Sequence, residues 1–431
     1  MRAISNLPGE LLLLVLEQTI LDARNSPVQS SGPITTLTTI TSVTSRWRRI
    51  AISHVPFWTH IYIKPSFHSE SSSAPTRILP SDLDRVYSFI QRSKQLPLHL
   101  YVYRSWMWWY LGSKDESLPE EHHNQWKMMY SLLTPHMQRC SSICLYTFGI
   151  AMSGDPLKFI HNAEFPLLQD ITFVGVDSNI PQEDGNELWT LRPEHISLRT
   201  LKFSDFRRYL PLALDRVWPS LSILELRVTS HFWPKVCDTL DQLPALTKLI
   251  LQVGRLSPTR LFNLSRHERV NLPLLKDIWT NTPMIWLGIS TPSLFSATIC
   301  FGTGTFTGGS YPPELVQPLA ELPLQELIFS DSDLPPARVL LILRAAATLK
   351  TLQFQECHGY EAILDTLVDV KEAQVHADDQ TQAAVLPVLR SMVIQNASDE
   401  PMMGPSPEFQ SCVRRLRSLS IDVQCNYYDE L

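Results

Sequence analysis

LRTLKF at residues 198–203 and LKTLQF at 349–354 share one pattern, in which a leucine is followed by further apolar residues three and five positions later. The second half of the pattern alternates with period two, which is typical of a strand with one face in a core and one face outside. The pattern therefore predicts short strands wherever it recurs. It recurs in LSILEL at 221–226, LTKLIL at 246–251, LQELIF at 324–329 and LRSLSI at 416–421.

The spacing of the motif matches that of leucine-rich repeats, which recur every ~20–29 residues. Most successive motifs lie 19 to 30 residues apart, and the interval from Leu349 to Leu389 is 40 residues. We interpret CSSICL at 140–145 and PLHLYVY at 97–103 as earlier units of the series. The first apolar position of the motif falls at Leu168, Leu198, Leu221, Leu246, Leu275, Leu294, Leu324, Leu349, Leu389 and Leu416.

Proline precedes several motifs, as in FPLL at 165–168 and LPAL at 243–246, and we expect it to form the turn into each strand. Helical stretches such as ARVLLILRAAATL at 337–349 and EAILDTLVDVKEA at 361–373 fall between motifs. Strands that alternate with helices predict an α/β fold. We expect a right-handed solenoid with a curved parallel sheet, in which about ten stacked units form one continuous core.

The outward face of such a sheet is the candidate surface for binding a protein target. Trp279 is the strongest candidate for a contact, because a large aromatic side chain on an open face favours a covering partner. The alternative is that Trp279 packs on a loop or on its neighbours. The outward positions are Lys202, Ser204, Glu225, Arg227, Ile250, Gln252, Trp279, Asn281, Ile328, Ser330, Gln353, Gln355, Val393 and Gln395. Of these, the polar residues and the tryptophan that we expect to contact a target are Lys202, Glu225, Arg227, Gln252, Trp279, Asn281 and Gln353.

A leucine run, LPGELLLLVL, occupies residues 7–16. Pro8 and Glu10 precede the run and Glu17 follows it, which does not fit a signal peptide, and no window reaches the ~20 apolar residues of a membrane span. Pro8 and Glu10 suit the first turn of a helix, so we expect a helix that starts near Pro8. Since Leu11 to Leu16 are apolar all round, that helix needs cover on more than one side.

A second helical face is predicted by Leu37, Ile40, Val43, Trp47 and Ile50, which lie three or four residues apart and are followed by Ala51. The threonines between them favour a strand by propensity, but strict alternation is absent. We expect His54-Val55-Pro56 to end the helix, and Trp58, Ile61 and Ile63 to form an anchor and a short strand.

These N-terminal residues resemble an F-box domain over about residues 4–63. LPGELL at 7–12, then Val43, SRWRRIA at 45–51 and finally Trp58 follow the family pattern of LPxELL, VCRRWRxxA and a tryptophan. Gly9 and Thr44 depart from it, where a proline or acidic residue and a cysteine are usual, and the loop at 23–36 is longer than in compact members.

The resemblance implies a trihelical module that docks on the adaptor Skp1 and, through it, joins a cullin–RING ubiquitin ligase. One side of the leucine helix would then pack on the second helix and the rest on the adaptor. The alternative is a helical cap on a larger domain. The residues implied in Skp1 binding are Leu7, Pro8, Leu11, Leu12, Val15, Leu16, Val43, Trp47, Ile50 and Trp58.

The expected organisation is an F-box-like domain at 4–63, a Ser- and Pro-rich linker at 64–82 and a leucine-rich-repeat-like solenoid at 83–431. The chain has 431 residues and a formal charge of −6, which gives no support for nucleic-acid binding. Its seven scattered cysteines fit reduced thiols better than a disulfide framework. We therefore expect a cytoplasmic or nuclear protein with no membrane partner.

No catalytic motif is present among the common hydrolase, zinc-protease and P-loop signatures, and we expect neither catalysis nor a cofactor. The glycine-rich stretch at 301–313 reads as a loop rather than a phosphate site. His122 and His123, beside Glu120 and Glu121, read as a solvated segment rather than a metal site. In YVYRSWMWWYLG at 101–112 the first half predicts a strand, and the tryptophans are expected to cap the solenoid rather than to line a pocket.

Two functions from different classes remain. The first is a non-catalytic substrate receptor of a ubiquitin ligase, with the helices bound to Skp1 and the repeats bound to an unknown protein target. The second is a repeat scaffold for protein interactions outside any ligase. A hydrolase or transferase is a distant third, since no convergent set of titratable residues is visible.

Overall fold

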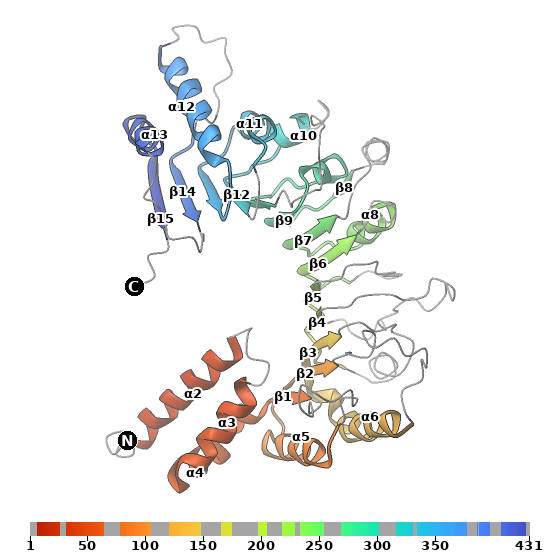
Figure 1. Ribbon diagram of the computed structural model, residues 1–431. Coiled ribbons are helices and arrows are strands. Elements are labelled where there is room, and N and C mark those ends of the chain that lie inside the picture. Colours follow the sequence, from red (N-terminus) through yellow and green to blue (C-terminus); the bar gives the residue numbers. More distant parts are fainter. Residues whose placement is uncertain are drawn as a thin grey trace. The chain divides into compact units, whose positions relative to one another are not determined.

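The computed structural model describes residues 7–25, 32–63, 78–104, 120–147, 165–174, 197–204, 218–228, 233–253, 269–300, 316–330, 334–376, 386, 388–396 and 407–427. The chain forms two compact units, Met1–Arg207 and Arg208–Leu431. Within the described ranges the fold is mixed α/β, with a large parallel sheet of 13 strands (Figure 1). The predicted α/β class and parallel sheet are thus confirmed.

The first unit places its strands in the order β1-β2-β3-β4-β5, and each neighbouring pair is parallel. Its helices are α2 (Gly9–Asn25), α3 (Gly32–Val43), α4 (Ser45–Ser53), α5 (Pro80–Arg92) and α6 (Glu120–Leu133), with the short 3-10 helices η1 (Val55–Trp58) and η3 (Thr134–Arg139). Its strands are β1 (His60–Ile63), β2 (Leu98–Arg104), β3 (Cys140–Thr147), β4 (Asp170–Val174) and β5 (Thr200–Ser204).

The second unit places its strands in the order β6-β7-β9-β11-β12-β13-β14-β15, again with parallel pairs, and β8 and β10 form a separate parallel pair. Its helices are α8 (Trp233–Asp241), η7 (Pro283–Leu287), α10 (Val316–Ala320), α11 (Pro336–Ala345), α12 (Tyr360–His376) and α13 (Pro407–Ser418). Its strands are β6 (Ile223–Val228), β7 (Lys248–Val253), β8 (Val270–Asn271), β9 (Asp277–Thr280), β10 (Ile289–Ser290), β11 (Ser296–Ile299), β12 (Glu326–Ser330), β13 (Thr351–Gln355), β14 (Ser391–Asn396) and β15 (Asp422–Tyr427).

The motif leucines form the core beside the sheet. From Leu168 to Leu389 the first apolar position of each motif lies two residues before a strand and is buried, for example at 0% exposure in Leu275 and Leu349. Along β4, β12 and β13, buried residues alternate with half-buried ones, so the fourth and sixth motif positions point into the core as predicted.

The turns before the strands explain the recurring prolines. The amide of Leu246 donates to the carbonyl of Leu243 at 3.2 Å, and Leu275 and Leu294 make the equivalent bonds to the residue three positions earlier. Pro244 thus occupies the second position of a four-residue turn, where its fixed φ is favourable. The predicted role of proline is confirmed there.

The last motif was assigned wrongly. Leu416 does not precede a strand but lies in α13, where it is fully buried, and β15 begins only at Asp422. LRSLSI at 416–421 therefore spans the end of a helix and the turn after it. Its leucine spacing also fits the buried face of a helix, and the charged residues between, such as Arg414 and Arg417, face outward.

The prediction of a single helical face over residues 37–51 is also wrong in one respect. Helix α3 ends at Val43 and α4 begins at Ser45, because Thr44 has extended backbone angles of φ −147° and ψ 163°. The side-chain oxygen of Thr44 accepts a hydrogen bond from the amide of Trp47 at 3.1 Å and caps α4. The threonine that departs from the F-box pattern is thus the residue that starts the next helix.

Other expected elements are present. Helix α2 begins directly after Pro8, β1 covers the predicted strand near Ile61 and Ile63, and β2 and β3 cover the two earlier units of the series. Helices α11 and α12 match the helical stretches predicted near 337–349 and 361–373. Helices α10, α11, α12 and α13 contact one another in that order and form a layer beside the sheet (Figure 1).

Some expectations fall outside the described residues, namely the tryptophans of 105–112 and the glycine-rich stretch at 301–313. The strand β1 lies within the segment assigned to the helical domain, yet it pairs with β2 of the sheet. Helix α5 starts at Pro80, inside the segment assigned to the linker. In the described part of the chain, no helix is long and apolar enough to cross a membrane.

Candidate functional site

Three N-terminal helices pack together through one side of the leucine run. Helix α2 contacts both α3 and α4, and Leu12, Leu16 and Ile20, which lie four residues apart, are buried at 0%, 1% and 3% exposure. Leu37 and Ile40 of α3 are buried as well. The inner face of α2 is therefore covered within the chain itself.

Polar contacts fix the relative positions of these helices. Arg46 of α4 donates to the carbonyl of Leu7, just before α2, and Arg48 donates to the carbonyl of Thr41 in α3 at 2.7 Å. His54, at the end of α4, lies 3.1 Å from the carboxylate of Glu17 in α2. Each end of α4 is thus tied to another helix.

Trp58 links the helices to the sheet. Its indole Nε1 donates to the carbonyl of Ala51 at 2.9 Å, and Ala51 is fully buried. Its ring meets Phe89 of α5 edge-on at 5.0 Å, and the guanidinium of Arg92 lies 4.3 Å from its centroid. This geometry gives a physical reason for an alanine and a later tryptophan in the RWRxxA…W sequence.

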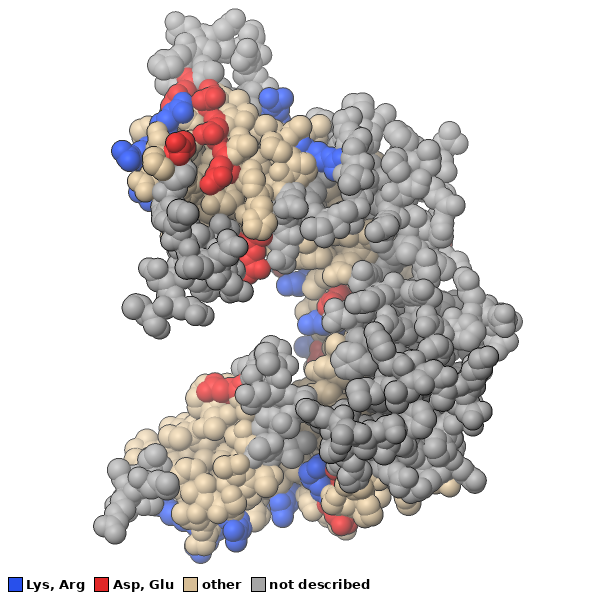
Figure 2. Space-filling view, viewed as in Figure 1, with Lys and Arg blue, Asp and Glu red and all other residues tan. Residues whose placement is uncertain are grey.

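The opposite side of α2 exposes an apolar stripe made of Leu11, Leu14, Val15 and Leu21. These residues are 49%, 60%, 45% and 47% exposed, and they lie on one helical face. Figure 2 shows the helical region (lower left) as a mainly uncharged surface with basic side chains gathered along its lower border. Val43 of α3 and Ile52 of α4 are exposed as well.

The residues predicted to bind Skp1 fall into three groups. Pro8, Leu11, Val15 and Val43 are exposed, whereas Leu7, Trp47 and Ile50 are half-buried. Leu12, Leu16 and Trp58 are buried within the chain, so they hold the helices together and are not available for direct contact. The sequence motif did not single out Leu14 and Ile52, although the uniformly apolar run around Leu14 indicated that all of its sides need cover.

Among the target-binding candidates, Asn281 has an internal role. Its side-chain oxygen accepts from the amide of Val253 and its amide donates to the carbonyl of Val253, both at 2.7 Å, which extends the ladder beyond the end of β9. Gln353 donates to Glu326 at 2.7 Å and accepts from Gln355 at 3.3 Å. The side chain of Asn281 thus has a role in the fold, and its contact with a target stays a prediction.

Trp279, Lys202, Glu225 and Gln252 are half-buried on the outward face of their strands. Trp279 is in register with Ile250 of β7 and Thr298 of β11, so apolar and small side chains flank its ring. The side chain of Arg227 lies outside the described residues, although its backbone belongs to β6.

The outward face of β1, β2 and β3 carries aromatic rings that the sequence reasoning did not identify as a site. His60 stacks on His99 at 4.3 Å, Tyr62 on Tyr101 at 4.5 Å, and Tyr103 on Tyr146 at 4.2 Å. The alternating HIYI of β1 and LHLYVYR of β2 were the available signal, since aromatic residues at every second position share one face. We call these six residues the aromatic face.

Arg24, at the end of α2, acts electrostatically on this face. Burial lowers the pKa of Arg24 itself and lowers the pKa of His60 to about 2, and the Arg24 charge contributes to the shift of His60. Burial also raises the pKa of Tyr62 and Tyr101. Near neutral pH, His60 is therefore uncharged and both phenols keep their protons.

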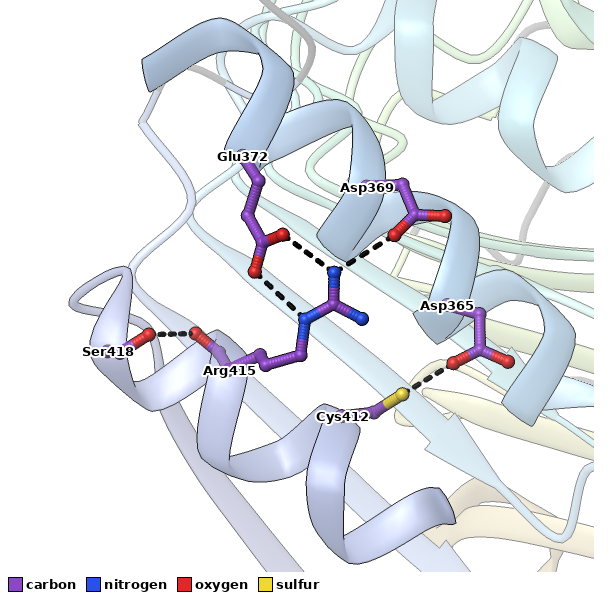
Figure 3. A network of polar contacts seen from close by, with 6 residues as sticks. All are labelled: Asp365, Asp369, Glu372, Cys412, Arg415 and Ser418. Atoms are coloured by element: carbon purple, nitrogen blue, oxygen red, sulfur yellow. Dashed lines mark hydrogen bonds and ion pairs between the residues drawn. The ribbon is translucent and has the colours of Figure 1, made fainter. Parts of the chain in front are cut away.

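A polar network joins α12 and α13 in the second unit (Figure 3). Arg415 donates to Glu372 at 2.6 and 2.9 Å and to Asp369 at 3.0 Å, and the thiol of Cys412 donates to Asp365. Burial and the Asp365 carboxylate raise the pKa of Cys412 to about 11, which leaves a protonated and unreactive thiol near pH 7. The network holds two helices together and is a poor candidate for chemistry.

No group of three or more histidine, cysteine or acidic side chains that could hold a metal occurs among the described residues. Helix α6 begins at Glu120, but the side chains of Glu121, His122 and His123 are outside the described part.

Comparison with known proteins adds little to this picture. No protein-family model matches the sequence, and no curated protein matches it. A crystal structure of a protein from Bacteroides fragilis matches 73% of this chain and 86% of its own chain, with a TM-score of 0.38 and 12% sequence identity. Similarity at that level carries no argument about function.

Proposed function

We propose that this chain is a non-catalytic substrate-receptor subunit of an Skp1–cullin–F-box ubiquitin ligase. In this proposal α2, α3 and α4 form an F-box-like module that binds Skp1, and the outward face of the sheet binds a protein target. The main observation in support is the exposed apolar stripe of α2. The other side of this helix is already packed on α3 and α4.

Exposure of this kind is unfavourable unless a partner covers it. Burying apolar surface is worth about 25 cal/mol per Å², or ~1.5–3 kcal/mol for one leucine or valine side chain. The stripe has the i, i+3, i+4 spacing with which a helix docks into an apolar groove. The LPxELL motif spans the start of the helix that carries the stripe, and the RWRxxA motif and the tryptophan follow it in the sequence. This resemblance to an F-box is the reason for proposing Skp1 as the partner.

Two single variants test the docking step. Leu11→Asp and Leu14→Asp each place a charge on the stripe without disturbing the buried side of α2. We expect the full-length chain to copurify with co-expressed Skp1, and each variant to weaken the complex at least ~100-fold, because a carboxylate would be desolvated in the interface. Leu12→Asp is unsuitable, since Leu12 is fully buried and the variant would unfold.

Leu274→Asp is the matched control. Leu274 is 51% exposed but lies before β9, far along the sequence from the helices, so Skp1 binding should be unchanged. Far-UV circular dichroism should show all three variants folded. Failure of the wild-type chain to bind Skp1, or full binding by Leu14→Asp, would exclude the proposal.

Addition of the cullin distinguishes the two functional classes. A ligase receptor should form a ternary complex with Skp1 and the cullin on size-exclusion chromatography. A complex with Skp1 that never recruits the cullin would instead indicate the repeat scaffold acting outside a ligase. Point variants are preferable to deletion of residues 1–64 here, because that deletion removes β1 and leaves the edge of β2 unpaired.

A further inference from the structure

The aromatic face presents hydroxyl groups and ring edges rather than ring faces. Tyr62 and Tyr101 are nearly coplanar at 10°, and Tyr103 and Tyr146 at 5°, so the rings of each pair cover one another. Each stack covers one negatively polarised face of each of its rings, and the positively polarised ring edge and the phenolic O–H point away from the stack. Such groups favour an electron-rich partner.

Hydrogen bonds within the face leave donors available. The hydroxyl of Tyr101 lies 3.3 Å from Nδ1 of His60, and Tyr103 and Tyr146 share a hydrogen bond. Tyr146 also shares a hydrogen bond with Cys144, so the O–H of this pair that can donate elsewhere is that of Tyr103. Burial raises the pKa of Tyr103 and Tyr146 as well, so these hydroxyls keep their protons near neutral pH. Tyr62 is only 7% exposed, so the donors open to a ligand are those of Tyr101 and Tyr103.

Arg24 adds an incompletely satisfied positive charge. Its Nη2 makes one long bond, 3.5 Å, to the carbonyl of Pro56, and its buried Nε has no hydrogen-bond partner in the described part of the chain. Among the same residues no carboxylate is within ion-pair distance of it. A partly buried guanidinium that lacks an anion has lost hydration without compensation.

The border of the face is electrically balanced. Burial and the Arg24 charge lower the pKa of His99, and the Asp170 carboxylate of β4 opposes that shift. Burial raises the pKa of Cys144, and the Lys202 ammonium of β5 opposes that shift. One acidic and one basic residue of the neighbouring strands thus act on the face. Arg24 is the positive charge that acts on His60, His99, Tyr62 and Tyr101. Its charge complement is an oxyanion.

We propose that the aromatic face, together with Arg24, binds an acidic segment of a protein partner through its carboxylate groups. The six aromatic residues come from three adjacent parallel strands, which are ~4.8 Å apart, so the donors cover a length that fits several residues of an extended segment. A guanidinium and phenol hydroxyls are both good donors to carboxylates.

The inference rests on the proposed role of the sheet face in target binding, and it assigns a chemical class to that target. It also locates the recognition surface on β1, β2 and β3, next to the helices. Its test contains no Skp1, so its failure is distinguishable from failure of the docking proposal.

Fluorescence anisotropy with the full-length chain provides the test. The probe is a fluorescein-labelled Glu-Glu-Glu-Glu peptide, with Gln-Gln-Gln-Gln as its uncharged match. We expect binding of the glutamate peptide only, weakened at least ~10-fold by Arg24→Gln and ~3-fold to 10-fold by Tyr101→Phe, which keeps the ring and removes one donor. Arg24→Lys should restore part of the affinity because it restores the charge.

Arg344→Gln, at an exposed position of α11, removes one positive charge elsewhere and should leave the affinity unchanged. A far-UV circular dichroism spectrum equal to that of the wild-type chain would show that Arg24→Gln is folded. The proposal is overturned if the glutamate peptide fails to bind, if the glutamine peptide binds equally, or if Arg24→Gln has no effect. Displacement by inorganic phosphate at concentrations equal to those of the peptide would also overturn it, since it would indicate a simple anion site.

Discussion

Trp47 and Trp58 have the same side chain but different hydrogen bonding. Nε1 of Trp58 donates to Ala51, whereas the buried Nε1 of Trp47 has no partner within the described ranges. Trp58→Phe should therefore lower the free energy of unfolding by ~1–1.5 kcal/mol more than Trp47→Phe. Urea denaturation followed by far-UV circular dichroism measures both values, and equal losses would contradict the assigned role of the Trp58 hydrogen bond.

Thr44 offers a second test at single-residue scale. Its side chain accepts from the amide of Trp47 and caps α4, so Thr44→Ala should destabilise the fold by ~1 kcal/mol. Thr44→Ser keeps the accepting oxygen and should restore most of that loss. Thr38→Ala, at an exposed position inside α3, should instead be neutral or slightly stabilising in the same denaturation experiment.

At the element scale, the turns that lead into the strands differ in how a proline changes their stability. Pro244→Ala should reduce the free energy of unfolding by ~0.4–1 kcal/mol, because the turn residue gains freedom in the unfolded chain. Ala347 occupies the equivalent turn position before β13, but its amide donates to the carbonyl of Ala345 at 2.9 Å. Ala347→Pro removes that donor and should destabilise by ~1–3 kcal/mol, although the repeat pattern alone favours a proline there.

The strands were predictable from sequence because each is specified locally. A buried leucine, a turn and an alternating triplet recur from Leu168 to Leu389, and each strand needs only a neighbour of the same kind. The prediction was wrong at Leu416, where leucine spacing fits both a strand motif and a helix face. It was also wrong at Thr44, where a side-chain cap ends one helix and starts another without altering the apolar periodicity.

The candidate surfaces were less predictable, since exposure depends on contacts between distant segments. Whether Leu12 or Leu14 of the leucine run faces outward is decided by where α3 and α4 pack on α2. The aromatic face joins residues of three strands with Arg24 of α2, a grouping that no single stretch of sequence contains. The internal hydrogen bonds of Asn281 could not be predicted because its partner, Val253, lies 28 residues earlier.

The cysteines test the burial of the whole molecule, since they extend from β3 to β15 and none of the seven is in a disulfide. Burial raises the pKa of Cys140 and Cys237 to about 12, and that of Cys144 to about 11. Only thiolates react with iodoacetamide. In the native protein at pH 8, these buried cysteines should therefore be labelled much more slowly than half-exposed Cys300.

Below its pKa, the thiolate fraction of a buried cysteine rises about tenfold for each pH unit, so native-state labelling should increase from pH 7 to pH 9 in that proportion. Mass spectrometry of labelled peptides measures it for each cysteine. In urea, all seven thiols should react at similar rates. Native labelling of Cys140 as fast as that of Cys300 would contradict its burial in β3.

The strand β1 is encoded next to the N-terminal helices but is hydrogen-bonded into the sheet through β2. Trp58 connects the same segment to α4 and α5. For the evolution of such chains, this pairing limits recombination: a crossover after the helices would separate β1 from the partner strand that its side chains fit. The helices, β1, α5 and β2 are therefore expected to be inherited together, whereas later units can be exchanged without breaking the pairing of β1.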